Sequence, residues 1–262
     1  MSARISIVMP SFNQAEYVGR AIDSVQSQEG NFELEHIVID GGSTDGTLDV
    51  LKRYGDAVRW VSEPDEGQAD ALNKGLAVAT GEIVGWLNSD DLYEPGALAT
   101  VAGIFDSEPQ TQWLYGKVRI IDPDDREIRR WIKWYKDLRM RRYRYTKLIA
   151  ENWICQMGVF WRRSAGERVG AFRKDLRYAM DYDYWLRLGA HWPGRFVDRY
   201  LAAFRSYPAT KSRGEFALAL REALGVSLSH AKGKHPWAAF WSRVHCAKSI
   251  AALRVMRLLG GL

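Results

Sequence analysis

The chain has 262 residues, of which 47% are hydrophobic, so it can bury one substantial core and at most a smaller appended lobe. Its two cysteines, Cys155 and Cys246, lie far apart and match no metal spacing. This argues against a disulfide framework or a zinc site and favours a reducing, cytosolic setting. Since no apolar run approaches the roughly 20 residues of a membrane span, we expect a soluble or peripheral protein.

The net charge of +5 is unevenly distributed along the chain. Residues 126–147 contain ten Lys or Arg and only two acidic residues, so this segment alone carries more positive charge than the whole chain. A basic cluster of this density implies an anionic partner, which can be phosphate groups, acidic lipid or nucleic acid.

Strand-like and helix-like segments alternate over the first 120 residues. We predict helices at 15–27, 44–54, 68–79 and 95–105, the first with Asn13 as its cap, and two further helices in the tail from 216 to 262. Strands are predicted at 5–9, 34–40, 58–62, 83–87 and 113–122. This order indicates a mostly parallel sheet flanked by helices, in which ligands bind beyond the carboxyl ends of the strands. The loops at 10–14, 40–47, 63–68 and 88–91 are therefore the candidate site.

Paired carboxylates stand directly after the apolar strand at 83–87. Asp90 and Asp91 are costly to hold together unless a cation or hydrogen-bond donors neutralise them. Oxygen ligands of this kind suit Mg²⁺ or Mn²⁺, which typically bridge carboxylates to the phosphates of a substrate. The alternative is a strand end followed by a helix cap, since Asp is also a good N-cap ahead of a proline helix start.

The first two loops offer groups that suit a nucleotide. The ring of Phe12 and the amide of Asn13 can hold a base and a ribose, and the carboxylate of Asp40 can accept the imide N–H of a uracil ring. Gly41 and Gly42 allow the backbone to lie close to a ligand. A glycine turn with a helix cap explains the second loop equally well.

Two further acidic groups have both a functional and a structural interpretation. Asp70 and Lys74 follow the third loop at i,i+4 spacing and can also be an ordinary helix-surface pair. Asp181 and Asp183 are two residues apart, so they cannot share one face of a helix. Because Arg187 lies at i,i+4 from Asp183, we predict Asp181 as a general base and Asp183 as a structural group.

With these residues in place, the chain resembles the family 2 glycosyltransferases, which are inverting enzymes with the GT-A fold. The resemblance runs from residue 5 to about residue 212. Its motifs occur in family order: Val-Met-Pro-Ser-Phe-Asn at 8–13, Ile-Asp-Gly-Gly-Ser-Thr-Asp-Gly at 39–46, Gly-Gln-Ala-Asp-Ala-Leu-Asn-Lys-Gly at 67–75, Asn-Ser-Asp-Asp at 88–91 and Met-Asp-Tyr-Asp-Tyr-Trp at 180–185.

The resemblance implies a role for each matched residue. Asp90 would ligate Mn²⁺ or Mg²⁺, and Asp181 would be the general base. The acceptor side would include Trp153, Gln156 and Arg187. The nucleotide-sugar donor, with uridine as the commonest base of the family, would be bound by Pro10, Phe12, Asn13, Asp40, Ser43, Gln68, Asp70, Lys74, Asn88, Ser89 and Asp91.

Three positions depart from the family pattern. Asn88 replaces the first Asp of the usual Asp-x-Asp motif, and Met180 replaces the Glu that usually precedes the base. Tyr207 stands where related members often offer a His to the metal. A neutral phenol is a poor ligand, so the resemblance predicts weaker metal binding or more reliance on the diphosphate oxygens.

The resemblance also implies an α/β GT-A fold with a Rossmann-like sheet. We predict a catalytic domain at 1–212, divided into a nucleotide-sugar-binding half (1–122) and an acceptor half (123–212), and a helical extension at 213–262. The acceptor would be a glycan or a polyprenyl-linked glycan. The basic segment 126–145, with Trp131, Trp134, Tyr135, Tyr143 and Tyr145, is expected to be a lid or a face toward an anionic membrane, or else a solvated basic surface.

Three other interpretations stay open at this point. The tail can be an amphipathic membrane anchor, as Trp237, Phe240 and Trp241 suggest, or a helical pair packed on the catalytic domain. A sugar nucleotidyltransferase or a nucleotide-sugar-binding regulator can use the same fold. Single-stranded nucleic acid suits basic residues among aromatics, but the acidic loops argue against it, and we expect no nucleic-acid partner.

Overall fold

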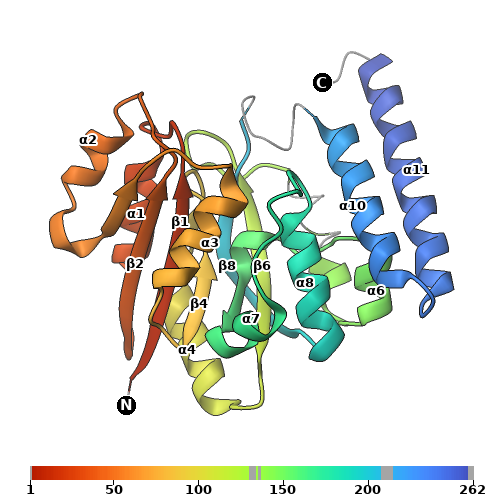
Figure 1. Ribbon diagram of the computed structural model, residues 1–262, viewed down its shortest axis with the longest axis horizontal. Coiled ribbons are helices and arrows are strands. Elements are labelled where there is room, and N and C mark those ends of the chain that lie inside the picture. The colour runs from red at the N-terminus through yellow and green to blue at the C-terminus, as the bar shows by residue number, and fades with distance from the viewer. Residues whose placement is uncertain (1, 130–133, 135–136, 208–214, 259–262) are drawn as a thin grey trace.

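The computed structural model describes residues 2–129, 134, 137–207 and 215–258, with side chains up to residue 252. Within these residues, strands form one sheet in the order β3-β2-β1-β4-β7-β6-β8-β5, with helices packed along it (Figure 1). The strands are β1 (Ala3–Ser11), β2 (Phe32–Asp40), β3 (Arg59–Ser62), β4 (Ile83–Trp86), β5 (Leu92–Tyr93), β6 (Trp113–Ile121), β7 (Val159–Arg162) and β8 (Arg195–Arg205).

The helices cover both faces of the sheet, as the alternation of side chains in β1 requires. Val8 packs into one buried cluster with Leu72, whereas Ile7 packs into the opposite cluster with Ile22. The helices are α1 (Val18–Gln26), α2 (Thr47–Lys52), α3 (Gln68–Val78), α4 (Ala97–Ser107), α6 (Tyr145–Ala150), α7 (Arg163–Val169), α8 (Met180–His191), α10 (Phe216–Ala231) and α11 (Pro236–Leu258), with 3₁₀ turns η1 (Gly55–Ala57) and η2 (Gln156–Gly158).

The first half of the sheet is parallel and contains the point at which the strand order reverses. β1 pairs in parallel with both β2 and β4, although β4 comes much later in the chain. The backbone N–H of Leu87 also donates to the carbonyl of Val8 (3.2 Å). The loops after β1 and β4 therefore leave the same edge side by side, which is where open α/β sheets bind their ligands.

The second half of the sheet is mixed, so the prediction of a mostly parallel sheet holds only for the first half. β7 runs antiparallel to β4 and β6, and β5 runs antiparallel to β8. The chain pattern did not predict β5, β7 or β8. Their partners are distant in sequence, and β8 pairs with β6 only through two shifts of register between Gly116 and Val118.

The predicted cap of the first helix is wrong. α1 begins at Val18 after Tyr17, and no side chain caps it. Asn13 instead adopts a left-handed conformation (φ 51°) and bonds to the loop after β2. Asn is one of the few residues that tolerates this conformation, so its short amide serves the loop and not the helix.

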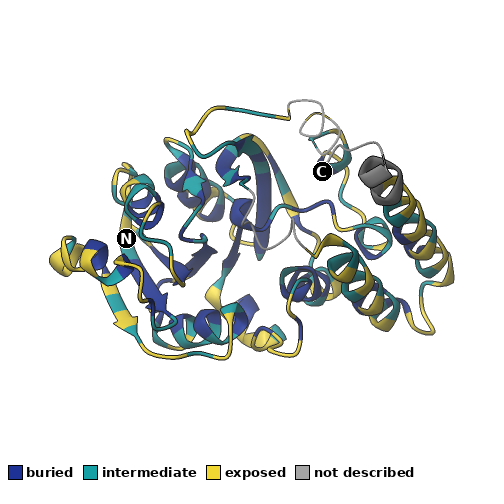
Figure 2. Ribbon diagram, turned by 90° about the horizontal axis from the view of Figure 1, so that it is seen from above, coloured by how far each residue is buried: buried dark blue, intermediate teal, exposed yellow. Residues whose placement is uncertain are grey.

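The two C-terminal helices lie side by side and pack against α6 and α8 (Figure 1). Val226 and Ala231 of α10 and Ala238 of α11 enter the same buried cluster as α8. Other parts of both helices are exposed, in contrast to the buried central strands (Figure 2). Within the described residues, every helix is too short or too polar to cross a bilayer.

Candidate active site

Asn88 is the centre of a hydrogen-bonded network directly after β4. Its Oδ1 accepts from Gln68 Nε2 (2.7 Å) and from Trp86 Nε1 (2.8 Å). Its Nδ2 donates to Asp91 Oδ2 (3.0 Å) and to Gln156 Oε1 (3.1 Å). Gln156 in turn donates to the carbonyl of Trp86 (2.5 Å). The Asn88 amide is used both as a donor and as an acceptor. An ionised carboxylate at this position could not make the two bonds that Nδ2 donates.

The two aspartates after Asn88 are held in a largely desolvated place. Asp91 is fully buried, and its Oδ1 accepts from the backbone N–H of Arg205 (2.9 Å). Burial raises the pKa of Asp90, and burial together with the neighbouring charge of Asp90 raises the pKa of Asp91 well above its usual value. A cation at this edge of the sheet would stabilise the ionised pair.

Arg205 lies next to the two aspartates, but its guanidinium bonds to the backbone of Asp90 and not to either carboxylate. Its guanidinium donates to the backbone carbonyls of Asp90 (2.8 Å), Asp122 (3.0 Å) and Pro123 (3.1 Å), and it forms an ion pair with Asp125 (2.5 Å). The fully buried Arg205 therefore fixes the backbone that presents the aspartates.

Tyr207 connects Asp90 with the loop after β1. Its hydroxyl donates to Asp90 Oδ2 (2.9 Å) and accepts from Gln14 Nε2 (3.2 Å), and its ring lies 5.0 Å from that of Tyr17. Burial, followed by the charge of Asp90, raises the pKa of Tyr207, so the phenol stays neutral. Tyr207 thus stabilises the carboxylate as a hydrogen-bond donor.

The residues present suit a divalent ion that is bound partly by a protein carboxylate and partly by oxygens of a substrate. No group of three or more His, Cys, Asp and Glu occurs among the described residues. Asp90, however, is a rim carboxylate with a raised pKa. Mg²⁺ is commonly held by one or two carboxylates plus the phosphates of a substrate, and Asp90 fits that arrangement.

The loop after β2 is organised by Asp40. This fully buried carboxylate accepts bonds from the Ser43 hydroxyl (2.5 Å) and N–H (2.8 Å), the Gly42 N–H (3.1 Å) and the Ser62 hydroxyl (2.7 Å). Gly42 has a φ of 82°, which a glycine adopts without strain. These bonds fix the shape of the loop, while the contact of Asp40 with a base stays a prediction.

The loop after β1 is joined to this second loop. The Asn13 N–H donates to Ser43 Oγ (2.7 Å), and Asn13 Oδ1 accepts from the Thr44 N–H (2.9 Å). Pro10 is buried within β1, whereas the Phe12 ring is 60% exposed. Among the predicted donor residues, Phe12 therefore offers an open aromatic surface beside the loops after β1 and β2.

Asp70 and Lys74 form ion pairs at the start of α3. Lys74 Nζ lies 2.7 Å from Glu63 and 3.5 Å from Asp70, and Lys174 Nζ contacts Asp70 (3.3 Å) and Glu66 (2.7 Å). The hydrogen bond from the Glu66 N–H, followed by Lys174, lowers the pKa of Asp70. The i,i+4 pairing is thus present, and Lys174 joins α3 to the segment that leads into α8.

A second connection between α3 and that segment comes from Asn73. Its side chain donates to the carbonyl of Phe172 (2.9 Å) and accepts from the Phe172 N–H (2.8 Å). The sequence pattern gave this residue no role, because its partner lies 99 positions away.

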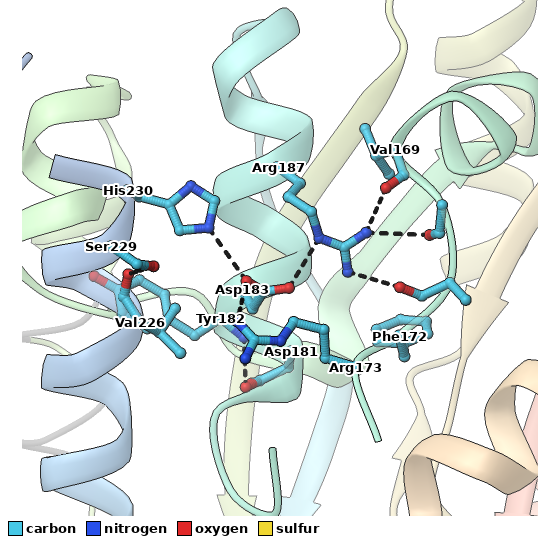
Figure 3. Close-up of polar contacts among 12 residues, drawn as sticks. Val169, Phe172, Arg173, Asp181, Tyr182, Asp183, Arg187, Val226, Ser229 and His230 are labelled. Carbon is cyan, nitrogen blue, oxygen red and sulfur yellow. Dashed lines mark hydrogen bonds and ion pairs between the residues drawn. The ribbon is translucent and has the colours of Figure 1, made fainter. Parts of the chain in front are cut away.

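Asp181 and Asp183 differ in environment, as their spacing predicts. Asp183 Oδ2 lies 2.8 Å from Arg187 Nε, and Oδ1 lies 3.2 Å from His230 Nε2 of α10 (Figure 3). Burial raises the pKa of Asp183, but the bond with His230 and the charge of Arg187 outweigh it, so the pKa is lowered. Asp181 is only partly buried in the first turn of α8.

The three residues predicted on the acceptor side lie in different environments. Trp153 is 2% exposed and packs edge-on against Tyr115 in the core. The Arg187 guanidinium is committed to Asp183 and to the carbonyls of Val169, Gly170 and Ala171. Gln156 accepts a hydrogen bond from the Asn88 side chain. The burial of Trp153 and the existing bonds of Arg187 therefore argue against contact of either residue with an acceptor.

The model of the family described as Glycosyl transferase family 2 matches residues 6–169, which is more than half of the chain. This chain belongs to that family. It is 31% identical over 188 residues to a PGL/p-HBAD biosynthesis glycosyltransferase of Mycobacterium tuberculosis, covering 70% of this chain and 68% of that protein. Another bacterial relative matches over only 39% of its length.

Two solved structures of glycosyltransferases share the fold of this family 2 member. A fragment of S. aureus TarS in complex with UDP-GlcNAc superposes with a TM-score of 0.66 at 18% identity, covering 86% of this chain and 66% of that one. A mannosyltransferase from Pyrobaculum calidifontis in complex with GDP-Man and Mn²⁺ gives 0.66 at 19% identity, covering 98% and 81%. The expected GT-A fold is therefore confirmed.

Proposed function

We propose that this family 2 member is an inverting glycosyltransferase that moves a sugar from a uridine diphosphate sugar to an acceptor hydroxyl. The observation that carries the proposal is the Asp90–Asp91 pair beyond β4, at the reversal of strand order, with Asp90 half-buried and Asp91 fully buried. Such a pair, with raised pKa values, suits a divalent cation bound together with a phosphate-bearing substrate.

Each proposed residue has one task in a single displacement. Asp181 takes the proton of the acceptor hydroxyl, and the oxygen attacks the anomeric carbon from the face opposite the diphosphate. The bond between that carbon and the diphosphate oxygen breaks, and the nucleoside diphosphate leaves with the electron pair. Mn²⁺ or Mg²⁺ held by Asp90 would supply Lewis-acid stabilisation of the leaving charge.

The donor is bound by the loops that the structure joins together. The open ring of Phe12 stacks on the base, and the loop held by Asn13, Asp40 and Ser43 contacts the base and ribose. UDP-GlcNAc and GDP-Man in the two structural neighbours support a nucleotide sugar as the donor class. Lys74 and Asp70 lie at the start of α3 on the sugar and phosphate side.

Release of nucleoside diphosphate from a panel of nucleotide sugars, with Mn²⁺, Mg²⁺ or chelator, tests the proposal. We expect metal-dependent release from one donor, and loss of that release in Asp90→Ala. Phe12→Ala should raise the KM for the donor about 10-fold, since stacking contributes roughly 1–3 kcal/mol per base. Inorganic diphosphate production from a nucleoside triphosphate and a sugar 1-phosphate would show a nucleotidyltransferase instead.

The proposed acceptor is a polyprenyl-linked glycan at an anionic membrane surface. A pocket of about 750 Å³ opens between α6 and the start of α11 and is lined by Lys147, Lys234 and Lys248. Trp237 and Trp241 also line this pocket and are 75% and 55% exposed. Aromatic rings next to basic groups suit a bilayer interface with acidic lipids.

Co-sedimentation with vesicles tests this membrane contact. We expect binding to vesicles that contain phosphatidylglycerol, weaker binding to pure phosphatidylcholine, and loss of binding in the Trp237→Ala, Trp241→Ala double variant. Both rings are exposed, so the variant should keep the thermal stability of the parent. Equal sedimentation of parent and variant would refute the contact.

The basic segment 126–145 was also predicted to face an anionic membrane. Of this segment, residues 130–133, 135 and 136, with Trp131 and Tyr135, lie outside the described residues.

A further inference from the structure

We propose that helix α10 positions the catalytic base, with Glu222 as the positioning residue. This inference rests on the proposed role of Asp181. It assigns to the C-terminal extension a part in the chemistry, although no residue of α10 belongs to the motifs of the family match, which ends at residue 169.

Glu222 binds the backbone at the entrance of α8. One carboxylate oxygen accepts from the N–H groups of Tyr178 (2.6 Å) and Ala179 (2.6 Å), and the other accepts from the N–H of Arg177 (3.1 Å). The helix has Ala179 as its N-cap and lacks a side-chain cap of its own. Glu222 therefore supplies, from another helix, the acceptors and the negative charge that a helix N-terminus favours.

A second connection between the same two helices lies one turn further along α8. His230 of α10 contacts Asp183, which is 2% exposed and also bonds to Arg187 (Figure 3). Arg173, from the segment before α8, approaches the same carboxylate at 3.8 Å. Asp183 thus joins α10, α8 and the preceding loop.

Asp181 lies between these two anchored points. Ala179 is held by Glu222, and Asp183 is held by His230, so both ends of the turn that carries Asp181 are tied to α10. The α10 face is itself fixed, since Ser227 donates to the carbonyl of Ile149 (2.6 Å). A general base must lie within hydrogen-bond distance of the proton that it removes, so loosening this turn should lower the rate of the chemical step.

The test compares Glu222→Ala with Glu215→Ala. Glu215 precedes the same helix, and its exposed pair with Arg177 is long (3.5 Å), so its loss should leave activity unchanged. We expect Glu222→Ala to lower kcat about 10- to 100-fold, since small displacements at a reacting centre have effects of this size. Donor affinity should stay the same, and Glu222→Gln, which keeps an acceptor oxygen, should restore part of the rate.

A double-variant cycle with Asp181→Asn separates positioning from a general loss of structure. If Glu222 acts through Asp181, Glu222→Ala should have no further effect on the residual rate of Asp181→Asn. An undiminished effect in that background, or an unchanged kcat in the single variant, would overturn the proposal. Hydrogen exchange of the amides at 177–179 should rise in Glu222→Ala whatever the reaction is. Unchanged exchange would overturn the anchoring itself, whereas absence of turnover in the parent would count against the proposed function alone.

Discussion

Asp181→Asn should lower kcat by about 10²–10⁴-fold, the contribution of a positioned general base. The amide has nearly the same shape as the carboxylate, and its oxygen can still accept the bond from the Tyr182 N–H (2.6 Å). Folding and donor affinity should therefore be unchanged. Rates of nucleoside diphosphate release in the presence of acceptor, together with calorimetric titration of the donor, measure the two quantities separately.

Asp183→Asn is the matched control, because it makes the same chemical change two residues away. Asp183 is 2% exposed, and removal of its charge leaves Arg187 with carbonyl acceptors but without its charged partner, so we expect a loss of stability of about 3–5 kcal/mol. The two variants should thus differ in kind: Asp181→Asn folds normally and has a much lower kcat, whereas Asp183→Asn unfolds more easily. Substantial turnover in Asp181→Asn would exclude this residue as the base.

The first four strands and helices were predictable because local signals agree with the final packing. Apolar runs, glycine turns and a proline before the fourth helix each indicate the element that forms. The i,i+4 pair of Asp183 and Arg187 was likewise predictable, since helix geometry alone brings these residues together, and the structure confirms the contact (2.8 Å).

The rest of the site depends on contacts between distant residues. Asn88 meets Gln156 across 68 positions, and Arg205 reaches the backbone of Asp90 across 115. No periodicity or spacing encodes such pairs. The sequence pattern therefore identified Asn88 as a departure from the family motif but gave no reason for the amide. The structure offers one, because the Asn88 Nδ2 donates to Asp91. Similarly, Trp153 was predicted on the acceptor side, and no local signal indicated that its ring would be only 2% exposed in the core.

Asn88→Asp should destabilise the metal-free protein by about 3 kcal/mol at neutral pH. One carboxylate oxygen can accept the bonds from Gln68 and Trp86, but the other would face the oxygens of Asp91 and Gln156 without a donor. Asn88→Ala is the uncharged comparison, because it removes all four bonds of the amide, including the two that Asn88→Asp loses, without adding charge. If Asn88→Asp, which keeps two of these bonds, is nevertheless the less stable variant in chemical denaturation, the added charge is the cause.

The sign of the pH dependence separates this explanation from a simple packing defect. The new carboxyl group, beside Asp90 and Asp91 with their raised pKa values, would have a folded pKa above its unfolded value of about 4. When it is protonated, the new carboxyl group can donate to Asp91, so Asn88→Asp should then approach the stability of the parent and exceed that of Asn88→Ala. The deficit of Asn88→Asp should grow as the pH rises through the folded pKa, and Mn²⁺ should reduce it. An equal deficit at pH 4 and pH 8 would show that repulsion among buried carboxylates is not the reason this chain has Asn at position 88.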